Sequence, residues 1–324
     1  MTLKHLLKAA SVIALITASG AAQAQIKVAL DSPADLDGSG TYVWAHTFAT
    51  YLNEHGMEAE EYQRGALGGD DEVFDQVTQG LVEVAMAPLG IASSIDTMIN
   101  GLRLPYFFSG IEQIDHALYD NGMLARINEG ITPAGVRIAS IVTVGPAAGI
   151  FNTRHPIATM ADMADLRMRA LDQAQIDLFQ AWGTTGTIVS WAEVPNALQT
   201  GVADGYVNPA FVPLLFGHTE FLHYYTPADI ITSMRSAIIS QDWYEGLSDE
   251  ERTTVDGAIA AATEANREWL STQTGVHEQL EAAGVTITEL TPEARTEFQD
   301  ASAVTYTTIV NADELAAWQA AIAE

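Results

Sequence analysis

Hydrophobic and polar residues follow two kinds of pattern along the chain. Ile26–Leu30 has the two-residue period of a strand, and residues 42–54 carry apolar side chains at helical spacing. The same order then recurs, with a strand expected over 58–62, a helix over 71–79 and a strand over 82–88. Strands that alternate with helices in this way predict an α/β fold with a largely parallel sheet.

A second α/β unit is expected to begin near Ile150, after a run of β-branched residues over 136–144. Its expected elements are a short helix over 163–166, a strand over 167–170 and helices over 172–182 and 194–200. A strand over 236–240 is expected to return toward the first unit, and a long helical tract over 248–283 and a helix from Pro292 onward follow it. We therefore predict a two-lobed clamshell with crossing strands. Its ligand site is expected in the cleft, at the carboxyl ends of the strands.

The 48% hydrophobic content is enough for one or two sizeable cores, and the length of the chain favours two domains. The predicted first lobe consists of residues 25–149 and about 234–257. The predicted second lobe consists of residues 150–233 and about 258–324, and it includes the long helix.

The N-terminus predicts export from the cytoplasm. Lys4 and Lys8 precede an apolar run over 9–18, and Ala22-Gln23-Ala24 fits the small-x-small rule for signal peptidase. Residues 1–24 are therefore predicted to be a signal peptide that is removed before Gln25. The apolar run is shorter than the roughly 20 residues needed to cross a bilayer, so a periplasmic protein is expected rather than a membrane-inserted one.

The charge balance excludes one class of partner and directs attention to the arginines. The chain has 14 basic and 42 acidic residues, and removal of Lys4 and Lys8 with the signal peptide leaves 12 minus 42, or −30. Such a field repels nucleic acid and anionic lipid. It fits adaptation to a salty medium and ordinary acidic solubility about equally well. An anionic ligand would have to be drawn in by local cations, of which the chain has few.

Motifs for catalysis are missing from the sequence. The chain has no cysteine, and its eight histidines form no His-Glu-x-x-His pair. There is no Gly-x-Ser-x-Gly elbow, and residues 67–71 lack the Lys-Ser/Thr of a phosphate loop. We therefore expect a protein that is not an enzyme and has no cofactor, and we expect its dispersed histidines to be surface or packing residues.

Asp35–Gly40 resembles a calcium loop, because it offers oxygen ligands at alternate positions and a glycine at the sixth. His46, however, stands where the bidentate glutamate should be, and the preceding segment reads as a strand rather than a helix. A polar turn that leads into a helix explains the same residues. Calcium binding stays an alternative.

Three segments resemble a known family. They are Arg64–Asp70 (RGALGGD), Leu104–Phe108 (LPYFF) and Ala197–Gly205 (ALQTGVADG) followed by Asn208-Pro209. This chain is similar to the solute receptors of tripartite ATP-independent periplasmic (TRAP) transporters, of the dicarboxylate or compatible-solute type. The resemblance implies a monomer of two α/β lobes braced by a long helix, which closes over a small organic anion and delivers it to a TRAP membrane permease.

The resemblance also implies ligand-binding residues. Arg169 matches the arginine that forms a two-pronged salt bridge with the ligand's carboxylate, and a planar guanidinium suits that role. The alternative is an internal partner such as Asp172. Asn208 matches an asparagine whose amide binds the same carboxylate, or else it is a turn residue before Pro209.

Other positions are less specific. Trp191 and Phe211 match aromatic walls, with core packing as the alternative for both. Asp31 matches a contact to the far end of the ligand, where a carboxylate suits a positive or hydroxyl-bearing group, with a loop or helix-capping role as the alternative. Relatives that bind sugar acids often carry a second arginine in a stretch that is here Gly145–Ile150 (GPAAGI). Arg235 and Arg64 are the available substitutes.

The missing arginine leaves the ligand open among a carboxylate, a sulfonate and a zwitterionic compatible solute. The rival from another functional class is a periplasmic hydrolase or isomerase that acts on a small carboxylate through paired acidic residues. A receptor for another transporter class would lack the Ala197–Gly205 segment and the Asn208-Pro209 pair, which this chain has.

Overall fold

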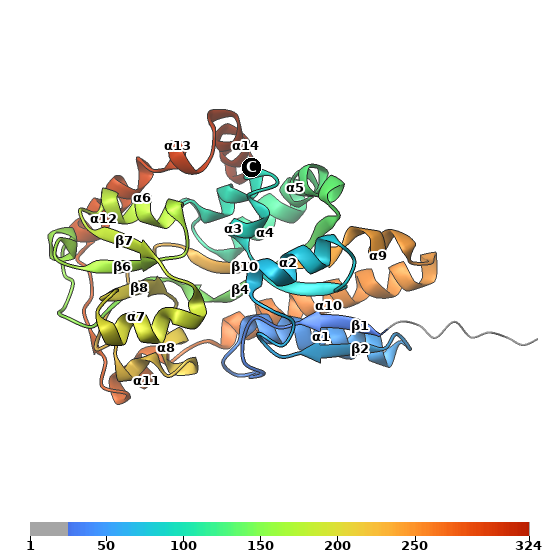
Figure 1. Cartoon of the computed structure of the whole chain (residues 1–324). Coiled ribbons are helices and arrows are strands. Elements are labelled where there is room, and N and C mark those ends of the chain that lie inside the picture. The colour runs from blue at the N-terminus through green and yellow to red at the C-terminus, as the bar shows by residue number, and fades with distance from the viewer. Residues whose placement is uncertain (1–24, 324) are drawn as a thin grey trace, which may run out of the picture.

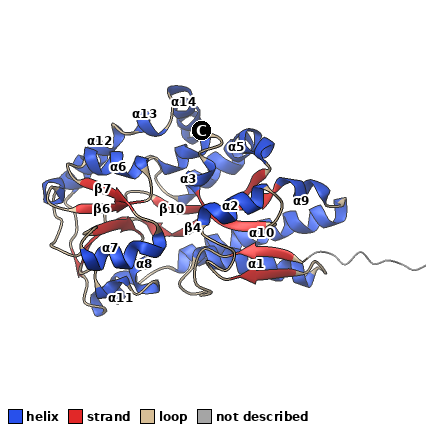
Figure 2. Ribbon diagram, viewed as in Figure 1, coloured by secondary structure: helices blue, strands red, loops and turns tan. Residues whose placement is uncertain are grey.

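The computed structural model describes residues 25–323 and contains two α/β lobes, each built on its own sheet (Figures 1 and 2). The predicted fold class is confirmed. The predicted signal peptide, residues 1–24, lies outside the described residues. Within the described range, none of the helices is both long and apolar enough to cross a bilayer.

The first lobe contains a five-stranded sheet in the order β2-β1-β3-β10-β4. Its strands are β1 (Ile26–Ala29), β2 (Ala59–Tyr62), β3 (Val84–Pro88), β4 (Val136–Ala147) and β10 (Thr232–Ser240). β1 is parallel to β2 and β3, and β10 runs antiparallel to β3 and β4. The carboxyl ends of β1, β2 and β3 therefore meet at one edge. β10 also reaches that edge, because Arg235 pairs with Pro88, the last residue of β3.

The second lobe contains a six-stranded sheet in the order β11-β9-β5-β8-β6-β7. Its strands are β5 (Gly149–Asn152), β6 (Arg167–Ala170), β7 (Thr185–Ile188), β8 (Gly205–Asn208), β9 (Tyr224–Thr226) and β11 (Thr286–Ile287). β6 is parallel to both β7 and β8. The carboxyl ends of these strands form the corresponding edge of this lobe.

Helices cover both faces of each sheet (Figure 2). They are α1 (Gly40–Glu54), α2 (Asp70–Thr78), α3 (Leu89–Ala92), α4 (Ile111–Asp115), α5 (Met123–Ile131), α6 (Gln173–Ala181), α7 (Val194–Thr200), α8 (Val212–Leu215), α9 (Gln241–Gly246), α10 (Asp249–Thr272), α11 (Val276–Ala282), α12 (Pro292–Ala303), α13 (Tyr306–Ile309) and α14 (Ala312–Ala323). Along β3 the side chains alternate between two cores, with Ala85 and Ala87 in one and Val84 and Met86 in the other. Burial on both faces explains why the strand reads as a continuous apolar run.

The long helix differs from its expected place. The sequence put residues 258–324 in the second lobe, but Ala258 and Ala262 of α10 pack in a core of the first lobe. α14 also returns to the first lobe (Figure 1), where Trp318 is fully buried and its Nε1 donates to the Met98 carbonyl oxygen. Small residues on one face of α10 let it lie close against α1, which decides the placement. Only the end of α10 reaches the other lobe, through Trp269.

The helical tract expected over 248–283 is divided into α10 and α11. Gly275 lies between them with φ of +73°, a conformation that glycine adopts without strain and that ends a helix. The short helix expected over 163–166 instead spans Met160–Met163. Asp172 lies just outside α6 and caps it, because its carboxylate accepts the N–H of Gln175.

Candidate functional site

The edge of the second lobe brings two of the expected ligand-binding residues together. β6 and β8 are parallel neighbours in which Arg169 lies opposite Tyr206. Asn208 ends β8. Because alternate residues of a strand face the same side, Tyr206 and Asn208 share one face of the sheet. The topology therefore places Arg169 and Asn208 at the same carboxyl edge.

Arg169 is a buried cation, with 4% of its surface exposed. Its Nε donates a hydrogen bond to the Val189 carbonyl oxygen at 2.9 Å, and its Cζ lies 5.5 Å from the Trp191 ring centroid. No carboxylate of the described residues forms an ion pair with it, and Asp172, the expected alternative partner, binds Arg103 instead. Burial, reinforced by the positive charge of Arg235, lowers the pKa of Arg169 to about 10, so the guanidinium stays charged at neutral pH.

Two polar atoms at the cleft are buried without a hydrogen-bond partner: Asn208 Nδ2 and Asp31 Oδ1. A buried donor or acceptor that stays unpaired costs about 1–3 kcal/mol, and most such groups in folded proteins find partners. One of these atoms is a donor and the other an acceptor. Together they can bind a ligand that accepts at one end and donates at the other.

The edge of the first lobe carries cations that are already paired. Asp31 follows β1, Arg64 follows β2 and Arg235 lies on β10. Arg235 Nε donates to Asp31 Oδ2 at 2.9 Å, and Arg64 donates to the Asp31 carbonyl oxygen. Arg64 also lies 3.5 Å from an oxygen of Asp70. Asp31 is thus held from two sides and keeps one free carboxylate oxygen.

The two edges face each other. Arg235 lowers the pKa of Arg169, and Asp70 raises it, although both belong to the opposite lobe. The charges at the two edges are therefore close enough to act on one another.

The two expected aromatic walls lie in different surroundings. Trp191 is half-buried beside Arg169 and packs against Phe216 and His218, with ring centroids 5.0 and 5.2 Å away. Phe211 is 6% exposed and packs edge-on against Trp269 of α10. Phe211 thus lies in the packing that joins the lobes, as its alternative interpretation describes, whereas Trp191 borders the arginine.

Sequence analysis missed Tyr206 and His218 beside Arg169. The Tyr206 hydroxyl and His218 Nδ1 are 3.2 Å apart, and both side chains are buried. Burial and the charge of Arg169 lower the pKa of His218 to about 4, so its imidazole is neutral at pH 7. Tyr206 could have been found from its spacing to Asn208 on one strand. His218 gave no signal in the sequence, because its neighbours are distant in the chain.

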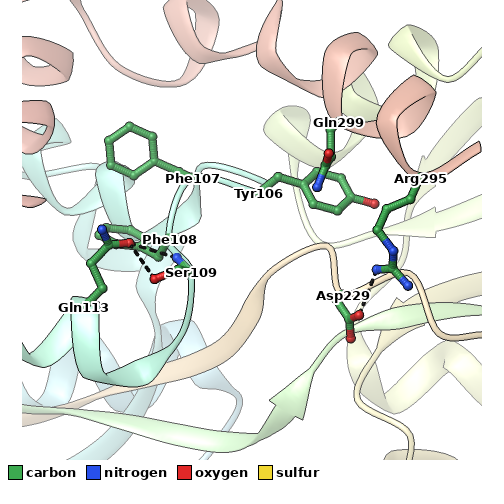
Figure 3. Close-up of a pocket in the computed structure, with 8 residues that line it drawn as sticks. All are labelled: Tyr106, Phe107, Phe108, Ser109, Gln113, Asp229, Arg295 and Gln299. Atoms are coloured by element: carbon green, nitrogen blue, oxygen red, sulfur yellow. Dashed lines mark hydrogen bonds and ion pairs between the residues drawn. The ribbon is translucent and has the colours of Figure 1, made fainter. Parts of the chain in front are cut away.

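A separate cavity of about 540 Å³ lies where Tyr106 and Phe107 approach α12 (Figure 3). Arg295 and Asp229 point toward each other in it and form an ion pair at 2.7 Å. None of the expected ligand-binding residues lines this cavity. Its arginine is already neutralised, so it lacks the unpaired cation that distinguishes the cleft.

The calcium-like segment forms the polar turn that was the competing interpretation. Asp35 Oδ1 accepts the N–H groups of Asp37 and Gly38, both at 2.9 Å, and Ser39 caps α1 by accepting the N–H of Tyr42. Between residues 25 and 323, no group of three or more acidic or histidine side chains is placed to hold a metal ion.

Comparison with known proteins gives a family match over most of the chain. Residues 30–313 match the model described as bacterial extracellular solute-binding protein, family 7. The chain is 24% identical over 239 residues to the ectoine-binding periplasmic protein TeaA of Halomonas elongata, covering 70% of this chain and 67% of the relative. It is 26% identical over 254 residues to the ectoine/5-hydroxyectoine-binding periplasmic protein UehA of Ruegeria pomeroyi, covering 76% and 74%.

Solved structures show the same fold. A TRAP periplasmic solute binding protein from Roseobacter denitrificans, with bound beta-D-glucuronate, superposes with a TM-score of 0.83 at 23% identity. The superposition covers 92% of this chain and 99% of the other.

Proposed function

Because the chain belongs to the bacterial extracellular solute-binding proteins of family 7, we propose that it captures a small organic anion in the periplasm and delivers it to a TRAP permease. The observation that carries this proposal is Arg169, a guanidinium with 4% exposure and no carboxylate partner among the described residues. A buried charge without a counter-ion is costly, and an anionic ligand relieves that cost. The family consists of binding proteins rather than enzymes.

In this proposal the two lobes hold opposite ends of the ligand. The terminal nitrogens of Arg169 donate to the ligand's carboxylate in the two-pronged geometry that a guanidinium favours, and Asn208 Nδ2 donates to the same group. Asp31 Oδ1 accepts a hydrogen bond from the far end. Trp191 borders the anionic end and excludes water from it. Arg235 and Arg64 hold Asp31 in place and add positive field at the cleft.

This arrangement favours a ligand with a carboxylate at one end and a hydroxyl or cationic donor at the other. Compatible solutes that are zwitterions and sugar acids both meet that description. The printed names of TeaA and UehA state ectoine binding, and the Roseobacter structure holds glucuronate. Of the two classes, the free oxygen of Asp31 favours the zwitterion, because a carboxylate binds a cationic donor more strongly than a neutral hydroxyl.

A thermal-shift screen of the mature protein tests the proposal. The panel contains ectoine, D-glucuronate, a C4 dicarboxylate and a sulfonate, and Arg169→Ala is the control variant. A ligand that binds only the folded state raises the melting temperature by mass action. We expect at least one anion to shift the wild type and none to shift Arg169→Ala. Equal shifts in both proteins, or none in the wild type, would overturn the proposed site.

A turnover assay on the same compounds separates the receptor from the rival enzyme. We expect each compound to be recovered unchanged after prolonged incubation with the protein. Conversion at a rate proportional to protein concentration would instead support the hydrolase or isomerase.

A further inference from the structure

An ion pair joins the two lobes beside the cleft. Arg103 ends the 3₁₀ helix η1 (Thr97–Arg103) of the first lobe, and Asp172 caps α6 of the second lobe. The Arg103 guanidinium donates to Asp172 Oδ2 and, through its other terminal nitrogen, to Asn100 Oδ1 at 2.8 Å. The side chains are 16% and 34% exposed. The pair is therefore partly shielded from water, and Arg103 is oriented by its own lobe.

Asp172 is also tied to the proposed anion site. It follows β6, the strand that carries Arg169, and it is close enough to act electrostatically on that guanidinium. A free carboxylate so near could pair with Arg169 or repel an incoming anion. In the structure Arg103 neutralises this carboxylate, while its other oxygen, Oδ1, stays engaged with the N–H of Gln175.

We propose that Arg103 is a positioning residue for ligand capture: it binds Asp172 when the lobes come together and so keeps that carboxylate away from Arg169. This inference rests on the proposed function. Arg103 and Asp172 belong to different lobes, so any movement of η1 away from α6 breaks the pair. The ion pair therefore favours the closed arrangement of the lobes. Because the same Asp172 carboxylate could otherwise pair with Arg169, closure also leaves Arg169 free to bind the ligand.

A substitution in α3 offers a second way to test the contact between Arg103 and Asp172. A Cβ added at Gly90 would lie 3.0 Å from Asp172 Oδ2 and 3.4 Å from Arg103 Cζ. This space is tight because the ion pair occupies it. The 3.4 Å approach to Arg103 lies within the first lobe, whereas the closer approach to Asp172 exists only while the two lobes are joined. Gly90→Ala therefore acts on the closed arrangement without changing any charge.

The test measures Kd, kon and koff by stopped-flow and calorimetry, with ectoine and D-glucuronate as probes. The variants are Arg103→Gln, Asp172→Asn and the double substitution. Asparagine caps a helix as well as aspartate does, so Asp172→Asn removes the charge and keeps the cap. We expect Arg103→Gln to raise Kd about 10-fold, mainly through koff, because closure is lost after encounter and the Asp172 carboxylate is freed. Asp172→Asn should raise Kd less, because no carboxylate remains to pair with Arg169. We expect the double variant to be no worse than either single one.

Gly90→Ala should also raise koff, as Arg103→Gln does, and it should leave the melting temperature of the ligand-free protein unchanged. The matched control is Arg154→Gln, which breaks an ion pair between Arg154 and Asp165 that lies within the second lobe. Its Kd should equal that of the wild type. A wild-type Kd in Arg103→Gln, or additive effects in the double variant, overturns the role of Arg103 alone. A wild type that binds neither probe nor any other anion of the screen overturns the proposed function and this inference with it.

Discussion

The two edges of the cleft use their arginines in opposite ways. At the edge of the second lobe, Arg169 is buried and no carboxylate within residues 25–323 pairs with it, whereas at the edge of the first lobe Arg235 is bound to Asp31. The burial of Arg169 without a counter-ion costs free energy until an anion binds, whereas the charges of Arg235 and Asp31 neutralise each other within the protein. The difference teaches that the capacity to bind an anion depends on which cation the fold leaves unpaired and much less on how many cations line the cleft.

Replacement of Arg235 should have the largest effect on the ligand-free protein. Arg235→Met leaves the 6%-exposed Asp31 without its ion pair. We expect the free energy of unfolding, measured in urea, to fall by about 3 kcal/mol. The double variant Asp31→Asn/Arg235→Met should recover most of that loss, because no buried charge remains. An unchanged urea midpoint in Arg235→Met would show that the pair contributes nothing to the resting protein.

The corresponding substitution at Arg169 should behave in the opposite way. Arg169→Met removes a cation that is buried without a counter-ion, so the unfolding free energy of the ligand-free protein should stay the same or rise. The affinity for the anion should fall about 100-fold or more, as calorimetry would show. Arg169→Lys keeps the charge but not the planar fork, and its affinity should be intermediate. If Arg169→Met destabilised the protein as much as Arg235→Met, the contrast between the edges would be lost.

The pH dependence of stability should report the burial of His218 and, after it, the positive charge of Arg169. His218 has a folded-state pKa of about 4, below the ordinary 6.5, so the unfolded chain binds a proton that the folded protein does not. Its contribution is fully present above pH 6.5 and is lost as the pH falls toward 4, by about 2 to 3 kcal/mol. His218→Asn should flatten this part of the profile relative to the wild type. If stability changed with pH in the same way in the wild type and in His218→Asn, this part of the pH dependence would not come from His218.

Asn208 should show the smallest effect, and it should be confined to binding. Asn208→Leu has a similar shape but no amide, so it removes an unpaired buried donor. We expect about a 10-fold loss of affinity and no loss of stability in the ligand-free protein. Asn208→Asp places a like charge next to the anion and should weaken binding further. Unchanged affinity in both variants would mean that Asn208 only shapes the turn before Pro209.

Much of the fold could be predicted because it is local. Apolar periodicity identified β6 and α7 with the bounds that the structure has, since each is a clear pattern between turn residues. β5, β7, β8, β9 and β11 were missed as strands, because runs of two to four residues carry little periodicity. β6 is equally short, but its sequence Arg-Met-Arg-Ala alternates between charged and apolar residues. Gly275 was the local signal that the helical tract expected over 248–283 is divided in two. The prediction missed it because apolar residues have helical spacing on both sides of this glycine.

The sequence by itself determined the α/β class and the family, and it predicted Arg169 and Asn208 as ligand-binding residues, because these depend on periodicity and on motifs of adjacent residues. Only the tertiary structure decided how the charges pair. Arg235 and Asp31 are 204 residues apart, and Arg103 and Asp172 are 69 apart, so nothing local links either pair. Sheet topology and lobe contact bring each pair together. They also leave Arg169 without a carboxylate, and that missing partner makes it the proposed anchor for the ligand.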